Sequence, residues 1–170
     1  MPMPPDAPAP SDPSPEDPHD QRPLEMTPDS DLVRVLEQLN AMEPSLTSMT
    51  PAEARDVSSS LFENSAPPPD TLEVTDHTIP GPAGPLAARL YRPKGRTPCP
   101  LFVAFHGGGW VLGSIAMYEG EACAMAVNSR CAVLSVDYRL APEHPFPAAV
   151  DDAFAAVEWA HANAAALNCD

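Results

Sequence analysis

The first regular pattern of apolar residues lies between positions 31 and 43 and has the spacing of a helix. Apolar side chains recur there every three or four residues, which places them on one helical face: Leu32, Val35, Leu36, Leu39 and Met42. Ser30 or Asp31 is a suitable N-terminal cap, and Pro44 ends the segment. We therefore predict an amphipathic helix over these residues.

A second amphipathic helix is predicted directly after the first. Thr50 and Glu53 stand at the spacing of a capping box, with Pro51 at the first helical position. An apolar stripe follows and runs up to three prolines at 67–69: Ala54, Val57 and Leu61. Because short amphipathic helices need a partner for their apolar face, we expect both helices to pack on the domain that follows.

From residue 71 the apolar period falls to two, which is typical of strands. The segments 72–77 and 86–91 predict two short strands, and residues 80–85 between them, Pro-Gly-Pro-Ala-Gly-Pro, are dense in turn formers. We expect an antiparallel hairpin.

Two continuous apolar runs, 101–105 and 132–136, then have strand length and suit strands buried on both faces. A helix fits between them at about 118–128, and another follows at 148–166. The apolar spacing of the latter predicts its buried face: Val150, Phe154, Val157 and Leu167. Alternating strands and helices indicate an α/β fold, with a mostly parallel sheet, flanking helices and right-handed crossovers.

The first thirty residues differ from all that follow, because they are crowded with Pro, Asp and Glu and hold almost no large apolar side chain. Such a segment buries too little surface to offset its ordering entropy. A docking role has no repeated PxxP-with-basic pattern to support it. We predict a disordered acidic, Pro-rich tail over 1–30, two helices over 31–66 and an α/β domain over 71–170.

The net charge of −15, from 9 basic and 24 acidic residues, bears on possible partners. The sequence has no basic cluster, which argues against binding of nucleic acid or anionic lipid. No apolar stretch approaches the eighteen residues of a membrane span, and residues 1–7 lack the basic start of a secretory signal. We expect a cytoplasmic protein without a membrane span.

Four cysteines, at 99, 123, 131 and 169, form neither a CxxC pair nor a cluster with zinc spacing. We expect free, mostly buried thiols in a reducing compartment and no metal site. The glycines at 107–109 are not followed by the Lys-Ser/Thr of a phosphate loop, so no nucleotide or other cofactor is expected.

The segment His106-Gly107-Gly108-Gly109-Trp110 carries the clearest chemistry and follows a predicted buried strand. Consecutive glycines let a loop adopt positive φ and bring backbone N–H groups close to a ligand. In acyl transfer such groups stabilise the negative charge that develops on the carbonyl oxygen. A tight glycine turn without chemistry is the alternative, but the preceding His and following Trp favour the oxyanion-hole loop found in lipases and esterases.

A second constellation, residues 137–147 (Asp-Tyr-Arg-Leu-Ala-Pro-Glu-His-Pro-Phe-Pro), follows the next predicted strand. Its prolines favour an ordered loop that leads into a helix. Arg139 can be held by a nearby carboxylate such as Glu143 or Asp151. His144 is a candidate general base by residue type, but we interpret it as a loop histidine among prolines.

Together, His106–Trp110 and Asp137–Pro147 resemble the hormone-sensitive lipase family of α/β-hydrolases, the family IV bacterial esterases, over roughly residues 49–170. The hairpin at 78–93 is also similar, and the two early helices resemble part of the family's N-terminal cap. The resemblance implies a serine carboxylesterase acting on small, short-to-medium acyl esters. Gly108 and Gly109 would donate N–H groups to the oxyanion.

The resemblance implies further roles for the neighbouring residues. His106 would brace the loop that includes Gly107, and Trp110 would stand near the acyl or alcohol pocket. Tyr138 and Arg139, with Glu143, would support the surroundings of the site.

The catalytic nucleophile that the family requires is not found in these 170 residues. No G-x-S-x-G is present, and all histidines precede the place where the nucleophile would stand, against the expected order Ser, Asp or Glu, His. Loss of nucleophile and base lowers turnover by on the order of 10⁶. We therefore expect the N-terminal part of an esterase, inactive by itself. A non-catalytic ligand-binding protein on the same scaffold, or peptide or lactone hydrolysis, are the alternatives.

The family's strand order, 1-2-4-3-5, has a consequence for the strand at 101–105. Without a fifth strand this most apolar strand becomes an edge, and exposed apolar edges template aggregation. We expect these 170 residues to self-associate.

Overall fold

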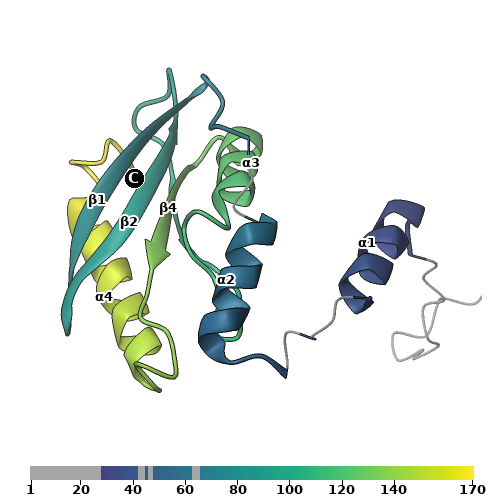
Figure 1. Ribbon diagram of the computed structural model, residues 1–170. Coiled ribbons are helices and arrows are strands. Elements are labelled where there is room, and N and C mark those ends of the chain that lie inside the picture. Colours follow the sequence, from purple (N-terminus) through teal and green to yellow (C-terminus); the bar gives the residue numbers. More distant parts are fainter. Residues whose placement is uncertain (1–27, 42–44, 46–47, 63–65) are drawn as a thin grey trace, which may run out of the picture. The chain divides into compact units, whose positions relative to one another are not determined.

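The computed structural model describes residues 28–41, 45, 48–62 and 66–170 (Figure 1). The chain divides into two compact units, residues 1–43 and 44–170, which are described separately. Most of the predicted acidic tail, residues 1–27, lies outside the described residues.

The first unit contains helix α1 (Ser30–Asn40), which confirms the helix predicted from the apolar spacing. Its start is capped one residue earlier than expected. The N–H of Asp31 donates to Oδ1 of Asp29 at 2.8 Å, and the N–H of Val33 donates to the Asp29 carbonyl at 2.9 Å. Burial of its apolar face stays a prediction.

Helix α2 (Pro51–Phe62) belongs to the second unit, together with the sheet. The predicted capping box is present: the N–H of Thr50 donates to Oε2 of Glu53 at 2.8 Å, and the N–H of Glu53 donates to Oγ1 of Thr50 at 3.4 Å. These bonds lower the pKa of Glu53. Ala54 and Ser58 are buried, so this face of α2 packs within its unit.

The sheet has the order β1 (Leu72–Gly81), β2 (Gly84–Pro93), β4 (Ala132–Asp137), β3 (Leu101–Phe105). β1 and β2 form the predicted hairpin, longer than expected and joined by residues 82–83 alone. β2 pairs with β4 antiparallel, whereas β3 pairs with β4 parallel. The expected parallel pairing is therefore confirmed for β3 and β4, but the described sheet as a whole is mixed.

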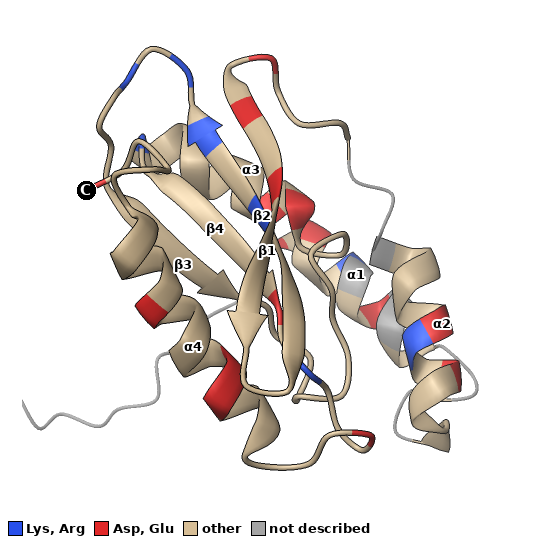
Figure 2. Ribbon diagram, turned by 90° about the vertical axis from the view of Figure 1, so that its left-hand side faces the viewer, with Lys and Arg blue, Asp and Glu red and all other residues tan. Residues whose placement is uncertain are grey.

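Two helices cover opposite faces of the sheet (Figures 1 and 2). Alternate strand residues supply the two cores, as strand geometry requires. The core under α4 (Ala148–Asn163) includes Ile79, Leu90, Leu134, Val136, Ala156 and Ala160. The core under α3 (Glu119–Ser129) includes Leu72, Tyr91, Ala122, Ala126 and Val133. β4 lies in the middle of both cores and five of its six residues are buried.

The predicted buried face of α4 is wrong for three of its four residues; the fourth, Leu167, lies beyond the end of the helix at Asn163 and is buried. Val150, Phe154 and Val157 are 53%, 65% and 47% exposed. The helix instead turns Asp152, Ala156 and Ala160 towards the sheet, at spacings of four residues. Small side chains let the helix axis approach the sheet closely, so the alanines, not the larger apolar residues, define the packed face.

β3 also departs from the expectation of burial on both faces. Phe102 and Phe105 are 49% and 38% exposed, because β3 lies at the edge of the described sheet. On its open side, the described residues make backbone contacts through residues 168–170. The backbones of Cys169 and Cys99, both free thiols, form an isolated parallel β-bridge, and the N–H of Leu101 donates to the carbonyl of Asp170 at 3.2 Å. The apolar edge expected from the family's strand order is thus present.

We predict that the 170-residue chain self-associates through this edge and the outward face of α4, because contiguous exposed apolar surface drives association. Light scattering should show dimers or larger species. Phe154→Glu should shift the distribution towards monomer, whereas Leu61→Glu, at an apolar residue of α2 that is 44% exposed, should not. A monodisperse wild-type monomer with a cooperative melt would contradict the prediction.

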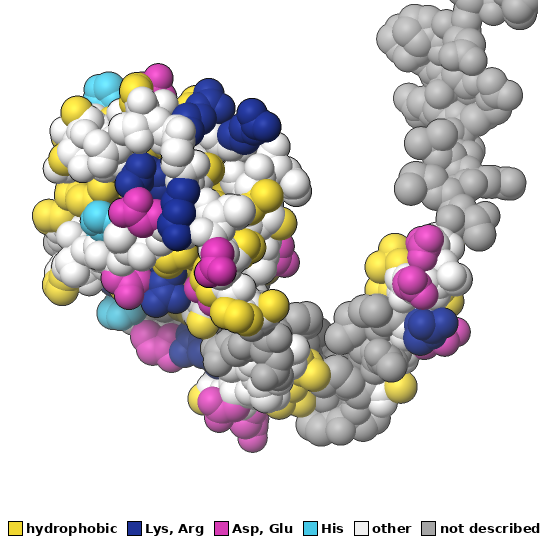
Figure 3. Space-filling view, turned by 90° about the horizontal axis from the view of Figure 1, so that it is seen from above, with side chains coloured by type: hydrophobic (Ala, Val, Ile, Leu, Met, Phe, Trp, Pro, Cys, Tyr) yellow, Lys and Arg dark blue, Asp and Glu magenta, His cyan; other side chains and the backbone are white. Residues whose placement is uncertain are grey.

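The fold gathers basic residues that the sequence leaves scattered. Figure 3 shows several Lys and Arg side chains close together on the surface seen from above. A groove of about 510 Å³ is lined by Lys94, Arg96 and Arg130, among others. The expectation that no basic cluster exists therefore needs correction, although the net charge of −15 still repels polyanions at long range.

Candidate active site

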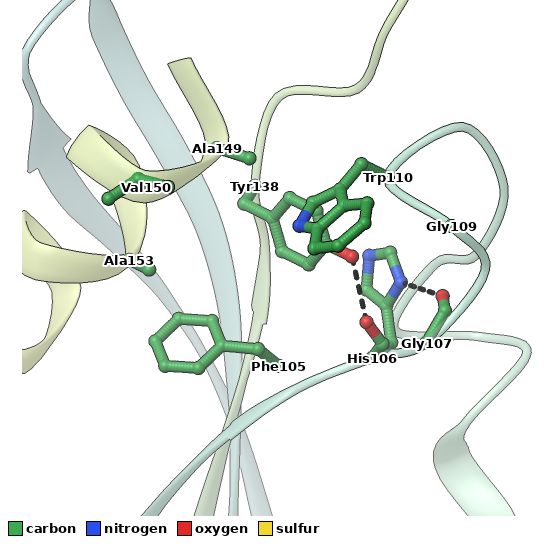
Figure 4. A pocket seen from close by; sticks show the side chains of 9 residues that line it. All are labelled: Phe105, His106, Gly107, Gly109, Trp110, Tyr138, Ala149, Val150 and Ala153. Carbon is green, nitrogen blue, oxygen red and sulfur yellow. Dashed lines mark hydrogen bonds between the residues drawn. The ribbon is translucent and has the colours of Figure 1, made fainter. Parts of the chain in front are cut away.

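The loop that follows β3 forms one wall of an apolar pocket of about 470 Å³ (Figure 4). His106, Gly107, Gly109 and Trp110 lie on this wall, and Tyr138 follows β4. Phe105 and the first turns of α4, through Ala149, Val150 and Ala153, close the other side. The predicted oxyanion loop thus lies at the carboxyl ends of two parallel strands, where ligands bind in open α/β sheets.

The backbone of this loop takes three consecutive positive φ angles: +119° at Gly108, +64° at Gly109 and +61° at Trp110. The turn is closed by the N–H groups of Val111 and Leu112, which donate to the carbonyl of Gly108 at 3.2 and 2.9 Å. In the part of the chain that the structure describes, the N–H groups of Gly108 and Gly109 donate to no protein acceptor. Free N–H groups beside a pocket are what an oxyanion hole requires.

The side chain of His106 fixes the base of the loop. It is almost fully buried, and its ring stacks on Tyr138 with centroids 4.4 Å apart and planes 16° from parallel. Its Nδ1 lies 2.9 Å from the carbonyl oxygen of Gly107, and the hydroxyl of Tyr138 donates to the His106 carbonyl at 2.7 Å. Burial raises the pKa of Tyr138, so this hydroxyl stays protonated as a donor at neutral pH.

Asp137, at the end of β4, holds the far end of the same loop. Its Oδ1 accepts the N–H of Ile115 at 2.7 Å and lies 3.9 Å from Nε2 of His106. Burial raises the pKa of Asp137, while the bond from Ile115 and the nearby His106 act to lower it. The sequence places this residue in its motif but gives it no role.

Arg139 is held by a carboxylate other than the two expected. Asp152, which is fully buried, accepts from Nε of Arg139 at 2.8 Å, from Nη2 at 2.7 Å and from its backbone N–H at 2.9 Å. Burial acts to raise the pKa of Asp152, but the hydrogen bonds from Arg139 outweigh it and the pKa is lowered. Glu143 and Asp151, the predicted partners, make no hydrogen bond to Arg139 among the described residues.

Glu143 instead pairs with Arg55 of α2, which the sequence did not single out. Both carboxylate oxygens accept from Arg55 at 2.8 Å. Hydrogen bonds from Arg55 and from the backbone of Glu143 itself, helped by the positive charge of Arg55, lower the pKa of Glu143 to about 2. His144 itself is exposed on the loop and borders a second pocket of about 490 Å³.

The pairing of Glu143 predicts a pH dependence. Because its folded pKa of about 2 lies below the ordinary value of 4.5, its contribution is complete above pH 4.5 and is lost as the pH falls towards 2. In thermal melts, wild type should exceed Glu143→Gln in Tm at neutral pH, and this difference should vanish by about pH 2. A Tm difference that is the same at both pH values would contradict the prediction.

Trp110 is 65% exposed and borders both pockets, together with Gly109, Ala149 and Val150. The second pocket extends to Ala141, Phe146 and Pro147. Apolar side chains dominate both linings, which suits the carbon chains of a small ligand.

Gly113 closes the loop against His106 and was also missed from the sequence. A β-carbon at this position would lie 2.1 Å from Nδ1 of His106 and 2.5 Å from the Gly107 carbonyl oxygen. Only the absence of a side chain permits this approach. A Gly-x₃₋₄-Gly spacing after the glycine run is the sequence signal that could have pointed to it.

No nucleophilic serine or cysteine lines the pocket between the loop and α4 in the described residues. His77 lies beside Trp159, with ring centroids 5.9 Å apart, and His161 is exposed on α4. The described part of the chain holds no group of His, Cys, Asp and Glu suited to a metal ion. None of its helices is long and apolar enough to cross a membrane.

Residues 102–170 match the sequence profile of a family described as the alpha/beta hydrolase fold. The chain also superposes on an esterase from Pyrobaculum calidifontis with a TM-score of 0.77 and 40% identity, over 85% of this chain. The chain has the α/β-hydrolase fold. The resemblance drawn from the two motifs is thereby confirmed.

Two further relatives of this chain are named as ester hydrolases. The carboxylic ester hydrolase LipN of Mycobacterium tuberculosis is 53% identical over 93 residues, 55% of this chain and 25% of the relative. An arylesterase of Saccharolobus solfataricus is 40% identical over 118 residues, 69% of this chain and 39% of the relative. The chain spans 47% of the Pyrobaculum esterase, so it covers less than half of each.

Proposed function

We propose that this α/β-hydrolase chain is the N-terminal part of a serine carboxylesterase and supplies its oxyanion hole. One observation carries the proposal: the glycine loop after β3 holds two N–H groups without a protein acceptor, at Gly108 and Gly109, and its residues Gly107 and Gly109 line an apolar pocket at the carboxyl end of that strand. Relatives named as esterases, 40% to 53% identical, support it.

In the proposed reaction, the ester carbonyl oxygen gains negative charge as a nucleophile attacks the carbonyl carbon. The N–H groups of Gly108 and Gly109 would donate to that oxygen, and each such donor contributes about 10²–10³ in rate. His106 and Tyr138 would keep the loop in place beforehand, so that no reorganisation is needed during the reaction.

The substrate in this proposal is a small ester with a short-to-medium acyl chain. The two hollows that share Trp110 measure about 470 and 490 Å³, and their linings offer few polar groups. One would take the acyl chain and the other the alcohol, with the carbonyl near the loop between them. No cofactor is required for this chemistry.

We further propose that the 170 residues alone do not turn over esters, since their sequence holds no G-x-S-x-G nucleophile. With a p-nitrophenyl butyrate assay, the isolated chain should match the buffer blank. Turnover blocked by a serine-directed phosphonate would contradict this part of the proposal.

A hybrid enzyme tests the proposed function directly. Residues 44–170 would replace the equivalent front part of the Pyrobaculum calidifontis esterase, with which the chain shares 40% identity. The remaining half of that esterase follows unchanged. We expect this hybrid esterase to hydrolyse p-nitrophenyl butyrate. A second hybrid, with the nucleophilic serine of the archaeal half replaced by alanine, measures the background.

Activity of the hybrid tests the oxyanion hole only if the hybrid is folded, so a cooperative thermal melt is recorded first. Turnover well above the serine-to-alanine hybrid supports an oxyanion hole in this chain. A folded hybrid that binds butyrate esters but does not hydrolyse them would overturn the proposal in favour of a ligand-binding role.

A further inference from the structure

Arg55 of α2 is bonded through all three of its guanidinium nitrogens. Nε donates to the carbonyl of Val111 at 2.8 Å, and Nη2 donates to the carbonyl of Ala141 at 2.8 Å. Nη1 and Nη2 also reach the two oxygens of Glu143, each at 2.8 Å. One side chain of the helix therefore joins the loop after β3 to the loop after β4.

The carbonyl held by Arg55 belongs to the turn that carries the free N–H groups. Val111 and Leu112 close that turn by donating to the Gly108 carbonyl, so fixing Val111 restricts the orientation of Gly108 and Gly109. The two loops are also joined directly, because the N–H of Ala141 donates to the carbonyl of Trp110 at 2.8 Å. Arg55 adds a third support to these contacts.

We propose that Arg55 is a positioning residue for the oxyanion loop, through which α2 acts on the reaction without touching the substrate. This inference rests on the proposed function. A planar guanidinium fits the role, because its fork binds two carbonyls and a carboxylate at once and costs little further ordering. The side chain is 29% exposed and Glu143 is 54% exposed, so geometry rather than burial carries its effect.

A residue that only adds to the stability of the fold, here called a filler, would act differently from a positioning residue. Loss of a filler lowers the stability of the whole unit, and every protected amide then exchanges faster. Loss of a positioning residue speeds exchange in the turn far more than exchange in the sheet. Misplacement of a catalytic group by about 1 Å lowers the rate by about 10²-fold, even where binding is unaffected.

Hydrogen exchange on the full 170-residue chain separates the two. We expect Arg55→Met to speed exchange of the Leu112 amide by about tenfold or more beyond any acceleration at the Leu134 amide in β4. Arg55→Lys, which keeps the positive charge but has a single nitrogen to donate from, should give a Leu112 exchange rate between those of the wild type and Arg55→Met. Arg92→Met is the matched control, since Arg92 forms an ion pair with Glu73 away from the loop, and it should leave Leu112 unchanged.

The hybrid esterase supplies the second measurement. Arg55→Met should lower kcat by about 10- to 100-fold with little change in KM, because the oxyanion exists only after substrate has bound. Equal acceleration of exchange at Leu112 and Leu134, or an unchanged Leu112, overturns the inference. If the unmodified hybrid is folded but inactive, the proposed function fails, while the exchange experiment still tests whether Arg55 holds the loop.

Discussion

Gly108→Ala is expected to lower kcat of the hybrid esterase by about 10²- to 10³-fold, the loss typical of a missing oxyanion donor. At a φ of +119° a β-carbon would lie 2.2 Å from the carbonyl oxygen of Leu112 and 2.5 Å from its carbonyl carbon. These are backbone atoms of the turn itself, and they cannot move aside without opening it. The N–H groups of Gly108 and Gly109 would then no longer point to a common place.

Gly95→Ala is the matched control for this substitution. Gly95 also has a positive φ, +78°, but lies between β2 and β3, and a β-carbon there would meet nothing within 4 Å. It should keep the kcat of the parent hybrid with a small loss of stability. A Gly108→Ala hybrid as active as the Gly95→Ala hybrid would show that the loop does not stabilise the oxyanion.

Asp152→Asn is expected to produce the largest loss of stability. Asp152 is fully buried and accepts the side chain and the backbone N–H of Arg139, so the substitution leaves the guanidinium without its counter-charge. Breaking a buried pair in this way should lower Tm by on the order of 10 °C, as followed by circular dichroism. Asp151→Asn, at the neighbouring exposed position of α4, should melt like the wild type.

A double substitution checks the cause of that loss. Arg139→Met with Asp152→Leu removes both charges and should recover part of the Tm, since no unpaired charge remains. If Asp152→Asn has the same Tm as Asp151→Asn, the Arg139–Asp152 ion pair does not stabilise the contact between α4 and the loop after β4.

Local patterns predicted most of the elements and the place of the loop. The capping box at Thr50 and Glu53 gave the start of α2, and the two apolar runs gave β3 and β4. These features depend on residues close in sequence, where backbone geometry alone sets the spacing. The glycine run pointed to the loop for the same reason, because positive φ is a property of single residues.

The contacts of the site depend on packing, and there the sequence was insufficient. Arg55 and Glu143 are 88 residues apart, and nothing near either residue marks the other. Arg139 was assigned to Asp151 or Glu143 because both carboxylates are near it in sequence, and the packed face of α4 was predicted from hydrophobic size. The alanines of α4 face the sheet instead. Neighbouring helical residues point about 100° apart, so this orientation brings Asp152 rather than Asp151 to Arg139. Asp152, Ala156 and Ala160, four residues apart, were the available signal.

At Trp110, whose backbone is left-handed, selection for folding and selection for turnover favour different residues. A bulky side chain at a φ of +61° costs about 1–3 kcal/mol, which glycine or asparagine largely avoids. Selection for folding alone would therefore replace this tryptophan, whereas selection for turnover would retain the aromatic wall shared by both pockets. A library at position 110 of the hybrid esterase, sorted by thermal stability, should be enriched in glycine and asparagine, and the same library sorted by activity should lose them.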